Sequence, residues 1–144
     1  MAEIIAEIGW NHMGDMKLAE KMIESASRSG ADFCKFQTWS VKYLTSGPWD
    51  TDGRREIYQK AELSRDQHIQ LRKICLENGT RFMTSVFNLE DIGFLSDLDN
   101  SIIKIPSHEV YNTDLIDQVC KHFDQVLIST GASKWKEIES INSS

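Results

Sequence analysis

The sequence predicts an α/β fold of the (β/α)8 barrel type, with the chain covering about the first five βα units as a partial barrel. Short apolar runs alternate with segments whose apolar residues recur every three to four positions, a pattern typical of strands joined by helices. The apolar runs end in polar or ionisable residues, as strands do at the active-site face of such barrels. A complete barrel takes roughly 250 residues, whereas this chain has 144.

The main alternative to a barrel is an open, doubly wound sheet, because parallel strands need long crossovers in both folds. The first turn lacks the G-x-G-x-x-G pattern of dinucleotide-binding sheets, and the chain has no G-x-x-x-x-G-K-[ST] phosphate loop. A partial barrel of the TIM type is therefore favoured. No internal linker is visible, so we expect a single domain over residues 1–144.

The first two strands are predicted over residues 3–8 and 31–37, where apolar runs follow one another along the chain. Turn residues end the first run. Between the two runs, apolar residues recur at helical spacing from Lys17 until Gly30, which is a typical C-terminal glycine. Residues 38–63 then form a connection much longer than the usual βα loop, and we expect a lid or binding loop there.

The later elements follow from capping signals and apolar runs. A capping box at Ser64 and Gln67 opens a helix that ends at Gly79. Asn88 and Asn112 are predicted helix N-caps, because asparagine accepts hydrogen bonds from the first free N–H groups. The remaining predictions are strands over 81–86, 101–105 and 125–130, short helices through Leu95 and Val119, and a last helix over 134–141.

Composition excludes some classes of partner. The formal net charge of −6 argues against nucleic acid, which requires a concentrated basic surface. No stretch reaches the roughly 18 apolar residues of a membrane span, and the first residues do not resemble a signal peptide. We therefore expect a cytoplasmic protein without a membrane partner.

Cysteine and histidine spacing predicts no metal site within the chain. The cysteines are far apart, without a C-x-x-C pair, and we expect all of them to be small buried hydrophobic residues. The histidines are scattered, and no H-x-H, H-x-x-H or H-E-x-x-H motif occurs. The residues concerned are Cys34, Cys75, Cys120, His12, His68, His108 and His122.

Glu7 is a candidate catalytic or substrate-orienting residue because it lies near the end of the first predicted strand, between apolar neighbours. The alternative is an ion pair with Lys35 or Lys104. Asn11 and His12 follow in the next loop. They are candidates for lining the mouth of a pocket, and equally for ordinary solvated or hydrogen-bonded loop residues.

Lys35 and Lys104 each lie inside an apolar strand, where an ammonium group must meet an anion. Two such lysines on different strands indicate a bound phosphate or carboxylate, and Gln37 adds an amide to the same strand end. Alternatively, one lysine is desolvated and forms a Schiff base with a carbonyl substrate. Spacing does not separate these two chemistries.

Hydroxyl groups at the later strand ends complete an anion-binding pattern. Ser85, Ser107 and Ser129 can donate to phosphate without adding charge, although serine at a strand end is also common as a helix cap. Glu109 is a second candidate catalytic carboxylate, for acid–base chemistry or cation binding; the alternative is an exposed loop glutamate.

Several motifs in register resemble the N-acetylneuraminate (sialic acid) synthase family. They are AEIGWNHMG at 6–14, GAD at 30–32 leading into KFQ at 35–37, KIPSHE at 104–109 and LISTG at 127–131. Their order and spacing match the family over nearly the whole chain. The resemblance implies a barrel enzyme.

Enzymes of that family condense phosphoenolpyruvate with an N-acetylated amino sugar, here N-acetylmannosamine-like, to a nonulosonic acid with release of phosphate. The resemblance implies a divalent metal, Mn or Mg, and a homodimer. It places Glu7 facing sugar and metal, and Glu109 as the second acid of the pocket, while the lysines act as electrostatic clamps. The positions matching the phosphoenolpyruvate site are Lys35, Ser85, Lys104, Ser107 and Ser129.

The resemblance also implies that the metal-binding histidines and the antifreeze-like lid domain lie outside this chain. The activity of the chain alone is therefore open. Two other hypotheses stand beside the synthase: a non-catalytic half-barrel that self-associates and binds a phosphorylated ligand, and an aldolase that forms a Schiff base through Lys35 or Lys104.

Overall fold

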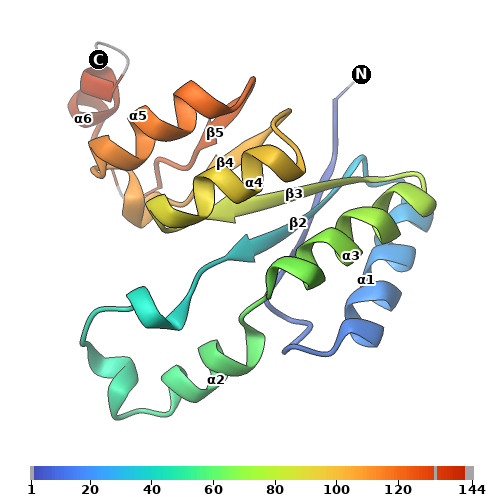
Figure 1. The fold of residues 1–144 in the computed structure, drawn as a ribbon. Helices are drawn as coiled ribbons and strands as arrows, with labels where there is room; N and C mark the ends of the chain where they lie inside the picture. The colour runs from blue at the N-terminus through green and yellow to red at the C-terminus, as the bar shows by residue number, and fades with distance from the viewer. Residues whose placement is uncertain (1, 132, 142–144) are drawn as a thin grey trace. The chain divides into compact units, whose positions relative to one another are not determined.

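The computed structural model describes residues 2–131 and 133–141. Five strands form a parallel sheet in the order β1-β2-β3-β4-β5, with helices between successive strands (Figure 1). The predicted α/β class is confirmed. Contacts divide the chain into two compact units, one up to Thr84 and one from Ser85 onward, and each is described by itself. The predicted single-domain organisation stays a prediction.

The first unit contains two complete βα units and the start of a third strand. Asp15 caps its first helix by accepting from Lys17 N and Leu18 N, and Gly30, with a φ of +84°, follows the end of that helix as predicted. The helices α1 and α3 pack side by side (Figure 1). The elements are β1 (Ile5–Gly9), α1 (Met16–Arg28), β2 (Phe33–Thr38), η1 (Val41–Tyr43), η2 (Pro48–Asp50), α2 (Arg54–Ala61), α3 (Arg65–Glu77) and β3 (Arg81–Val86).

The capping box predicted for the third helix is confirmed. Gln67 N donates to Ser64 Oγ at 3.2 Å, and Ser64 N donates to Gln67 Oε1 at 2.8 Å. Two N–H groups that the helix itself cannot satisfy are thereby paired. The start of α3 is fixed by local sequence, and its buried residues Leu71 and Ile74 face the core.

The long connection over residues 39–63 contains a helix, α2, that the sequence analysis did not predict. The Tyr58 ring packs edge-on against Trp10 and Trp39, with ring centroids 6.0 and 6.2 Å away. Trp39 Nε1 donates to Tyr58 O at 3.3 Å. Glu62 closes the connection by accepting from Ser40 Oγ at 2.8 Å. The connection thus contains a docked helix that these contacts stabilise, and its role as a lid or binding loop stays a prediction.

The second unit contains the later strands and helices around its own apolar core. The elements are η3 (Leu89–Asp91), α4 (Ile92–Leu98), β4 (Ile103–Ile105), η4 (Ser107–Glu109), α5 (Thr113–His122), β5 (Val126–Ile128) and α6 (Trp135–Ile141). The core residues are Val86, Ile92, Leu95, Ile103, Ile105, Leu115, Val119 and Phe123.

Two local predictions for the second unit have different outcomes. Asn112 caps α5 as predicted, accepting from Leu115 N at 3.1 Å. The prediction for Asn88 as a side-chain cap is wrong, because its Nδ2 instead donates to Asp91 Oδ2 at 3.1 Å. The amide therefore pairs with a side chain and leaves the backbone of η3 without a side-chain cap.

The cysteine prediction is correct for Cys34 and Cys75, which are buried, and wrong for Cys120, which is exposed. Cys120 follows Val119, and Val119 points into the core. Adjacent helical residues face about 100° apart, so the side chain after an inward one turns away. Helical phase therefore decides its exposure.

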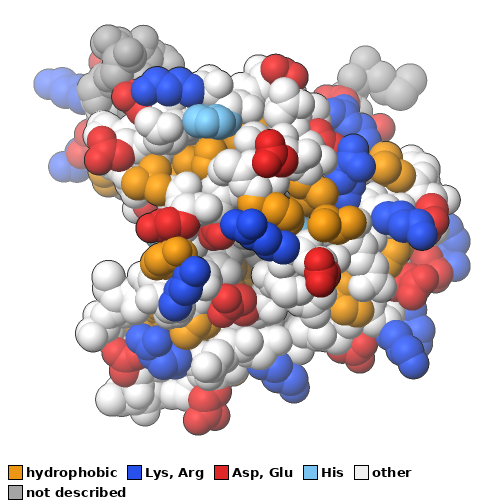
Figure 2. Space-filling view, viewed as in Figure 1, with side chains coloured by type: hydrophobic (Ala, Val, Ile, Leu, Met, Phe, Trp, Pro, Cys, Tyr) orange, Lys and Arg blue, Asp and Glu red, His pale blue; other side chains and the backbone are white. Residues whose placement is uncertain are grey.

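The surface carries charges of both signs. On the face shown in Figure 2, Lys and Arg side chains are interspersed with Asp and Glu, and the described residues there form no continuous basic area. Among the described residues, no helix is long and apolar enough to cross a membrane. The predicted cytoplasmic location stays a prediction.

We expect Tyr58→Ala to loosen the docked helix α2. Loss of two aromatic contacts worth about 0.5–1.5 kcal/mol each should raise local opening, and hence trypsin cleavage at Arg54 and Arg55, about tenfold. Cleavage is followed by gel densitometry under native conditions. The matched control is Tyr43→Ala, in the same connection but 38% exposed. Equal cleavage of the two variants would contradict the docking role of Tyr58.

Candidate functional site

Glu7 and Lys35 form an ion pair at the centre of the β1–β2 pairing. The parallel register places the two residues opposite each other, and Lys35 Nζ contacts a Glu7 carboxylate oxygen. The lysine side chain is only 8% exposed, whereas the glutamate side chain is 50% exposed. Of the alternatives for Glu7, the structure contains the ion pair with Lys35. Its catalytic assignment stays a prediction.

Gly9 is the point at which three predicted site residues come together. It has a left-handed φ of +59°, and a Cβ placed on it would lie 3.3 Å from Glu7 Oε1, 3.6 Å from Gln37 Nε2 and 3.9 Å from Asn11 Nδ2. Asn11 is held by its own hydrogen bond to Ile8 O, 2.8 Å long. One carboxylate and two amides thus form a polar cluster suited to hydroxyl and amide groups. Gly9 was not among the predicted site residues, although a glycine directly after a predicted strand was an available signal.

His12 is fully buried, in contrast to the half-exposed Glu7 side chain of that cluster. Its Nδ1 accepts a hydrogen bond from Gly14 N at 3.1 Å, and its ring packs against Phe36 with centroids 6.0 Å apart. Burial, and secondarily the charge of His68, lowers the pKa of His12. The structure therefore gives His12 a role in ordering the β1–α1 loop, and its assignment as a substrate-binding residue stays a prediction.

A buried polar chain joins the ends of β2 and β3 to α3. His68 Nδ1 donates to Ser64 O at 2.8 Å, since a carbonyl oxygen only accepts. In the neutral ring, Nε2 then accepts from Thr38 Oγ1 at 2.7 Å, and Thr38 accepts from Thr84 Oγ1 at 2.8 Å. Strand alternation places Thr38 on the face of β2 opposite Lys35. This hydrogen-bonded chain was not predicted, because His68 forms no motif with the other histidines. Its helical phase, three residues before Leu71, was an available signal.

In the second unit, Lys104 is flanked by the predicted hydroxyl residues. Ser85 lies opposite Lys104 in the β3–β4 register and is buried. Ser107 begins the turn that follows β4, and Ser129 N donates to Ile105 O at 3.1 Å beyond the end of β5. The three serines therefore lie near the carboxyl ends of three neighbouring strands, and the half-buried Lys104 lies on the central one of these strands. Ammonium and hydroxyl groups on adjacent strands are expected of an anion-binding site.

Glu109 lies in η4, close to Ser107 in the chain, and is partly buried. Its Oε2 accepts from Asn112 Nδ2 at 2.9 Å, and its Oε1 lies 3.7 Å from His108 Nε2. The carboxylate is thus held by the residue that caps α5. The exposed-glutamate alternative does not describe this geometry, while a catalytic role stays a prediction.

The described residues do not fit a complete metal site. Among them, no group of three or more His, Cys, Asp and Glu side chains is placed to hold a metal ion. The predicted divalent metal is untested by this arrangement. The chemistry of the site is therefore derived from the side chains of this chain alone.

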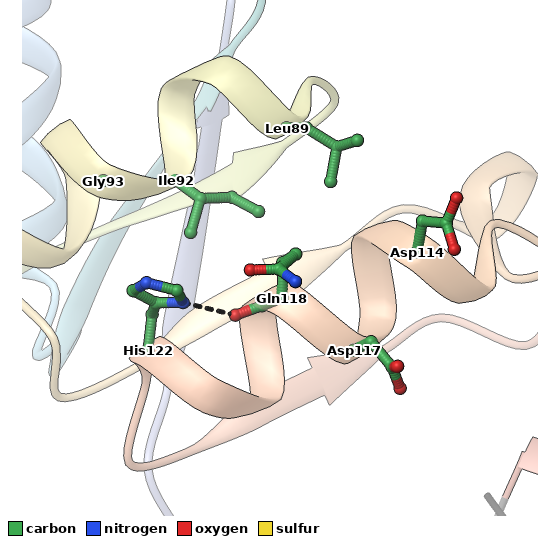
Figure 3. Close-up of a pocket in the computed structure, with 7 residues that line it drawn as sticks. All are labelled: Leu89, Ile92, Gly93, Asp114, Asp117, Gln118 and His122. Carbon is green, nitrogen blue, oxygen red and sulfur yellow. Dashed lines mark hydrogen bonds between the residues drawn. The ribbon is translucent and has the colours of Figure 1, made fainter.

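One cavity of about 510 Å³ lies on the helical side of the second unit, between α4 and α5 (Figure 3). Within it, His122 Nδ1 donates to Gln118 O at 2.7 Å. The cavity contains none of the predicted site residues. The lining residues are Leu89, Ile92, Gly93, Asp114, Asp117, Gln118 and His122.

Parallel strands joined by helices, with lysines, hydroxyls and carboxylates on the strands and just beyond their carboxyl ends, are typical of the (β/α)8 class of enzymes. Residues 22–143 match the model of the NeuB family, and the chain belongs to this family. The resemblance to sialic acid synthases noted from the motifs is thereby confirmed.

Characterised relatives are synthases of several sugar acids. The chain is 35% identical to the N,N'-diacetyllegionaminic acid synthase of Campylobacter jejuni, over 94% of this chain and 44% of the relative. It is 33% identical to the N-acetylneuraminate-9-phosphate synthase of Drosophila melanogaster, over 96% and 40%. It is 27% identical to the pseudaminic acid synthase of Helicobacter pylori, over 95% and 44%. The chain thus spans less than half of the length of these relatives.

Solved structures confirm the barrel-type fold. The N-acetylneuraminic acid synthetase of Leptospira borgpetersenii, crystallised with citrate, superposes with a TM-score of 0.89 at 26% identity, over 97% of this chain and 48% of that one. A truncated 3-deoxy-D-arabino-heptulosonate 7-phosphate synthase of Thermotoga maritima superposes at 0.70 with 13% identity, over 98% and 45%. The second likeness concerns the fold alone.

Stability should fall at acidic pH because of His12. Its pKa is lowered in the folded state, so the unfolded chain binds more protons once the pH drops below the ordinary histidine value of about 6.5. The stabilisation is fully present above that value and is lost as the pH falls. Urea unfolding at pH 7.5, 6.5 and 5.5 measures it.

His12→Asn keeps a side chain able to accept from Gly14 N and removes the titration, so its unfolding free energy should change less between pH 7.5 and 5.5. His122→Gln, on the exposed side of α5, is the control and should retain the slope of the unmodified chain. If His12→Asn leaves the pH dependence of the unfolding free energy unchanged, that dependence does not arise from His12.

Proposed function

We propose that this chain is part of a synthase that condenses phosphoenolpyruvate with an N-acetylated amino sugar, N-acetylmannosamine-like, giving a nonulosonic acid and phosphate. Membership of the NeuB family supports the reaction class. Relatives of similar identity are synthases of N,N'-diacetyllegionaminic acid, pseudaminic acid and N-acetylneuraminate 9-phosphate. The proposal therefore names a class of amino sugar and no single member of that class.

The observation that carries the proposal is the arrangement around Lys104. A half-buried ammonium with Ser85 opposite it, and with Ser107 and Ser129 at the adjoining strand ends, offers one positive charge and several neutral donors. Phosphate and carboxylate oxygens accept such charge-assisted hydrogen bonds strongly. We assign the anionic groups of phosphoenolpyruvate to these residues, and propose Lys35 of the first unit as a second ammonium for the same ligand class.

The proposed reaction forms one carbon–carbon bond. The methylene carbon of phosphoenolpyruvate attacks the aldehyde carbon of the open-chain sugar, and the aldehyde oxygen takes up a proton. Water then adds to the carbon that bears the phosphate and releases one proton. The bond between this carbon and the phosphate oxygen breaks, phosphate leaves with the second proton, and a ketone remains. Glu109 is proposed to transfer protons, while Glu7, Gln37 and Asn11 bind the sugar.

A divalent ion, Mn or Mg, belongs to the proposal for the whole enzyme, with ligands outside this chain. The residues that the structure describes do not themselves form a metal site. A homodimeric assembly is likewise part of the proposal. Both proposals concern the part of the relatives' sequences that this chain does not cover.

Titration calorimetry with phosphoenolpyruvate, and with inorganic phosphate, tests the anion site. Lys104→Ala removes the central charge and should weaken binding of both at least about tenfold, as expected for loss of a charged partner. Lys121→Ala, an exposed lysine of α5, is the matched control and should bind like the unmodified chain. Equal binding by both variants, or none by the folded unmodified chain, would overturn the assignment.

The Schiff-base aldolase is a second candidate with a distinct signature. The ion pair with Glu7 argues against Lys35 as the nucleophile, because a paired ammonium has no free electron pair. We expect no covalent adduct when pyruvate and borohydride are added, as measured by intact-protein mass spectrometry. An adduct that disappears in Lys35→Ala or Lys104→Ala would replace the synthase proposal by the aldolase.

A further inference from the structure

We propose that Glu7 is a built-in counter-ion that occupies the anion-binding position of Lys35 and is displaced when an anionic ligand binds there. This inference rests on the proposed function, because it takes Lys35 to be a ligand-binding ammonium. It adds a competition within the protein itself: the affinity for the anion includes the work of separating Glu7 from Lys35.

The ion pair is asymmetric, and the asymmetry determines which partner moves. Lys35 lies inside β2 and its side chain is 8% exposed, so an unpaired ammonium there would be strongly unfavourable. The Glu7 side chain is 50% exposed, so its carboxylate can return to water at little cost. An incoming anion can therefore replace Glu7, and the buried charge is never left unpaired.

The backbone around Glu7 provides a place for the displaced carboxylate. The β1–β2 register shifts between Glu7 and Gly9, and Gly9 has no side chain beside Glu7 Oε1. The amide nitrogens of Gln37 and Asn11 surround the same point, at 3.6 and 3.9 Å from the Cβ position. Each amide nitrogen carries two donor hydrogens, and Asn11 uses one on Ile8 O. The carboxylate can thus exchange Lys35 for amide donors.

The exchange has a consequence for ligand release. When the anion leaves, Glu7 pairs with Lys35 again, and this recovered interaction opposes tight retention of phosphate. The Glu7 carboxylate therefore lowers the affinity of the site for simple anions. Removing the carboxylate should strengthen anion binding, which is the opposite of the result expected for a residue that only supports the site.

The experiment compares Glu7→Gln with Glu3→Gln by titration calorimetry with inorganic phosphate. Glu3 is the matched control, because it precedes β1, carries the same charge and makes an exposed contact with Arg81, 3.9 Å long. We expect Glu7→Gln to bind phosphate about tenfold more tightly than Glu3→Gln, as for removal of a competing close charge. Equal or weaker binding by Glu7→Gln would overturn the proposal.

Thermal unfolding gives an independent readout. Without phosphate, Glu7→Gln should melt at a lower temperature than Glu3→Gln, because Lys35 is left without its counter-ion. Phosphate should raise the melting temperature of Glu7→Gln more than that of the control. If Glu7→Gln does not fold, Glu7→Asp, whose shorter side chain weakens the contact, should show a smaller gain in phosphate affinity, and no gain would overturn the proposal.

Two further variants separate this inference from the proposed function. Adding Lys35→Gln to Glu7→Gln should abolish the gain in phosphate affinity. If the gain persists in the double variant, it does not arise from Lys35, and the counter-ion role of Glu7 is rejected. If Lys104→Ala loses phosphoenolpyruvate while Glu7→Gln behaves like Glu3→Gln, the inference alone fails. If no variant, Glu7→Gln included, binds phosphoenolpyruvate or phosphate, both fail.

Discussion

The ammonium group of Lys35 lies inside a parallel strand that is buried along most of its length. Such a charge persists only when an anion is in contact with it, because the loss of hydration is otherwise uncompensated. The β1–β2 register meets this requirement by placing Glu7 directly opposite. The register shifts between Glu7 and Gly9, and the side-chain amides of Asn11 and Gln37 lie near the same point as the carboxylate.

The face of β2 opposite Lys35 is held by aromatic packing and by a chain of hydrogen bonds. Phe36 stacks on Phe82 with centroids 5.7 Å apart, and Thr38 is tied to His68 and Thr84 through hydrogen bonds. A strand buried on both faces must satisfy every polar group, and the hydroxyl–imidazole chain does so at its end. Helix α3 thereby fixes the position of the strand end that presents Gln37.

Much of the fold could be predicted because it depends on local signals. Apolar runs located the strands, and the capping box at Ser64 located the start of α3. Helix α2 could not be predicted, since its polar sequence is stabilised by Trp10 and Trp39 from distant positions. The Asn88 cap failed for a similar reason, because a neighbouring carboxylate competes for the amide.

The sequence by itself determined the order of strands and helices apart from α2, the family, and most of the polar residues proposed for the candidate site. These depend on spacing along the chain, which periodicity and motifs record directly. Only the tertiary structure decided how those residues pair: Glu7 with Lys35, Ser85 opposite Lys104, and His12 buried away from the polar cluster. Register between strands and burial arise from contacts between distant segments, and one residue of register changes which side chains face each other.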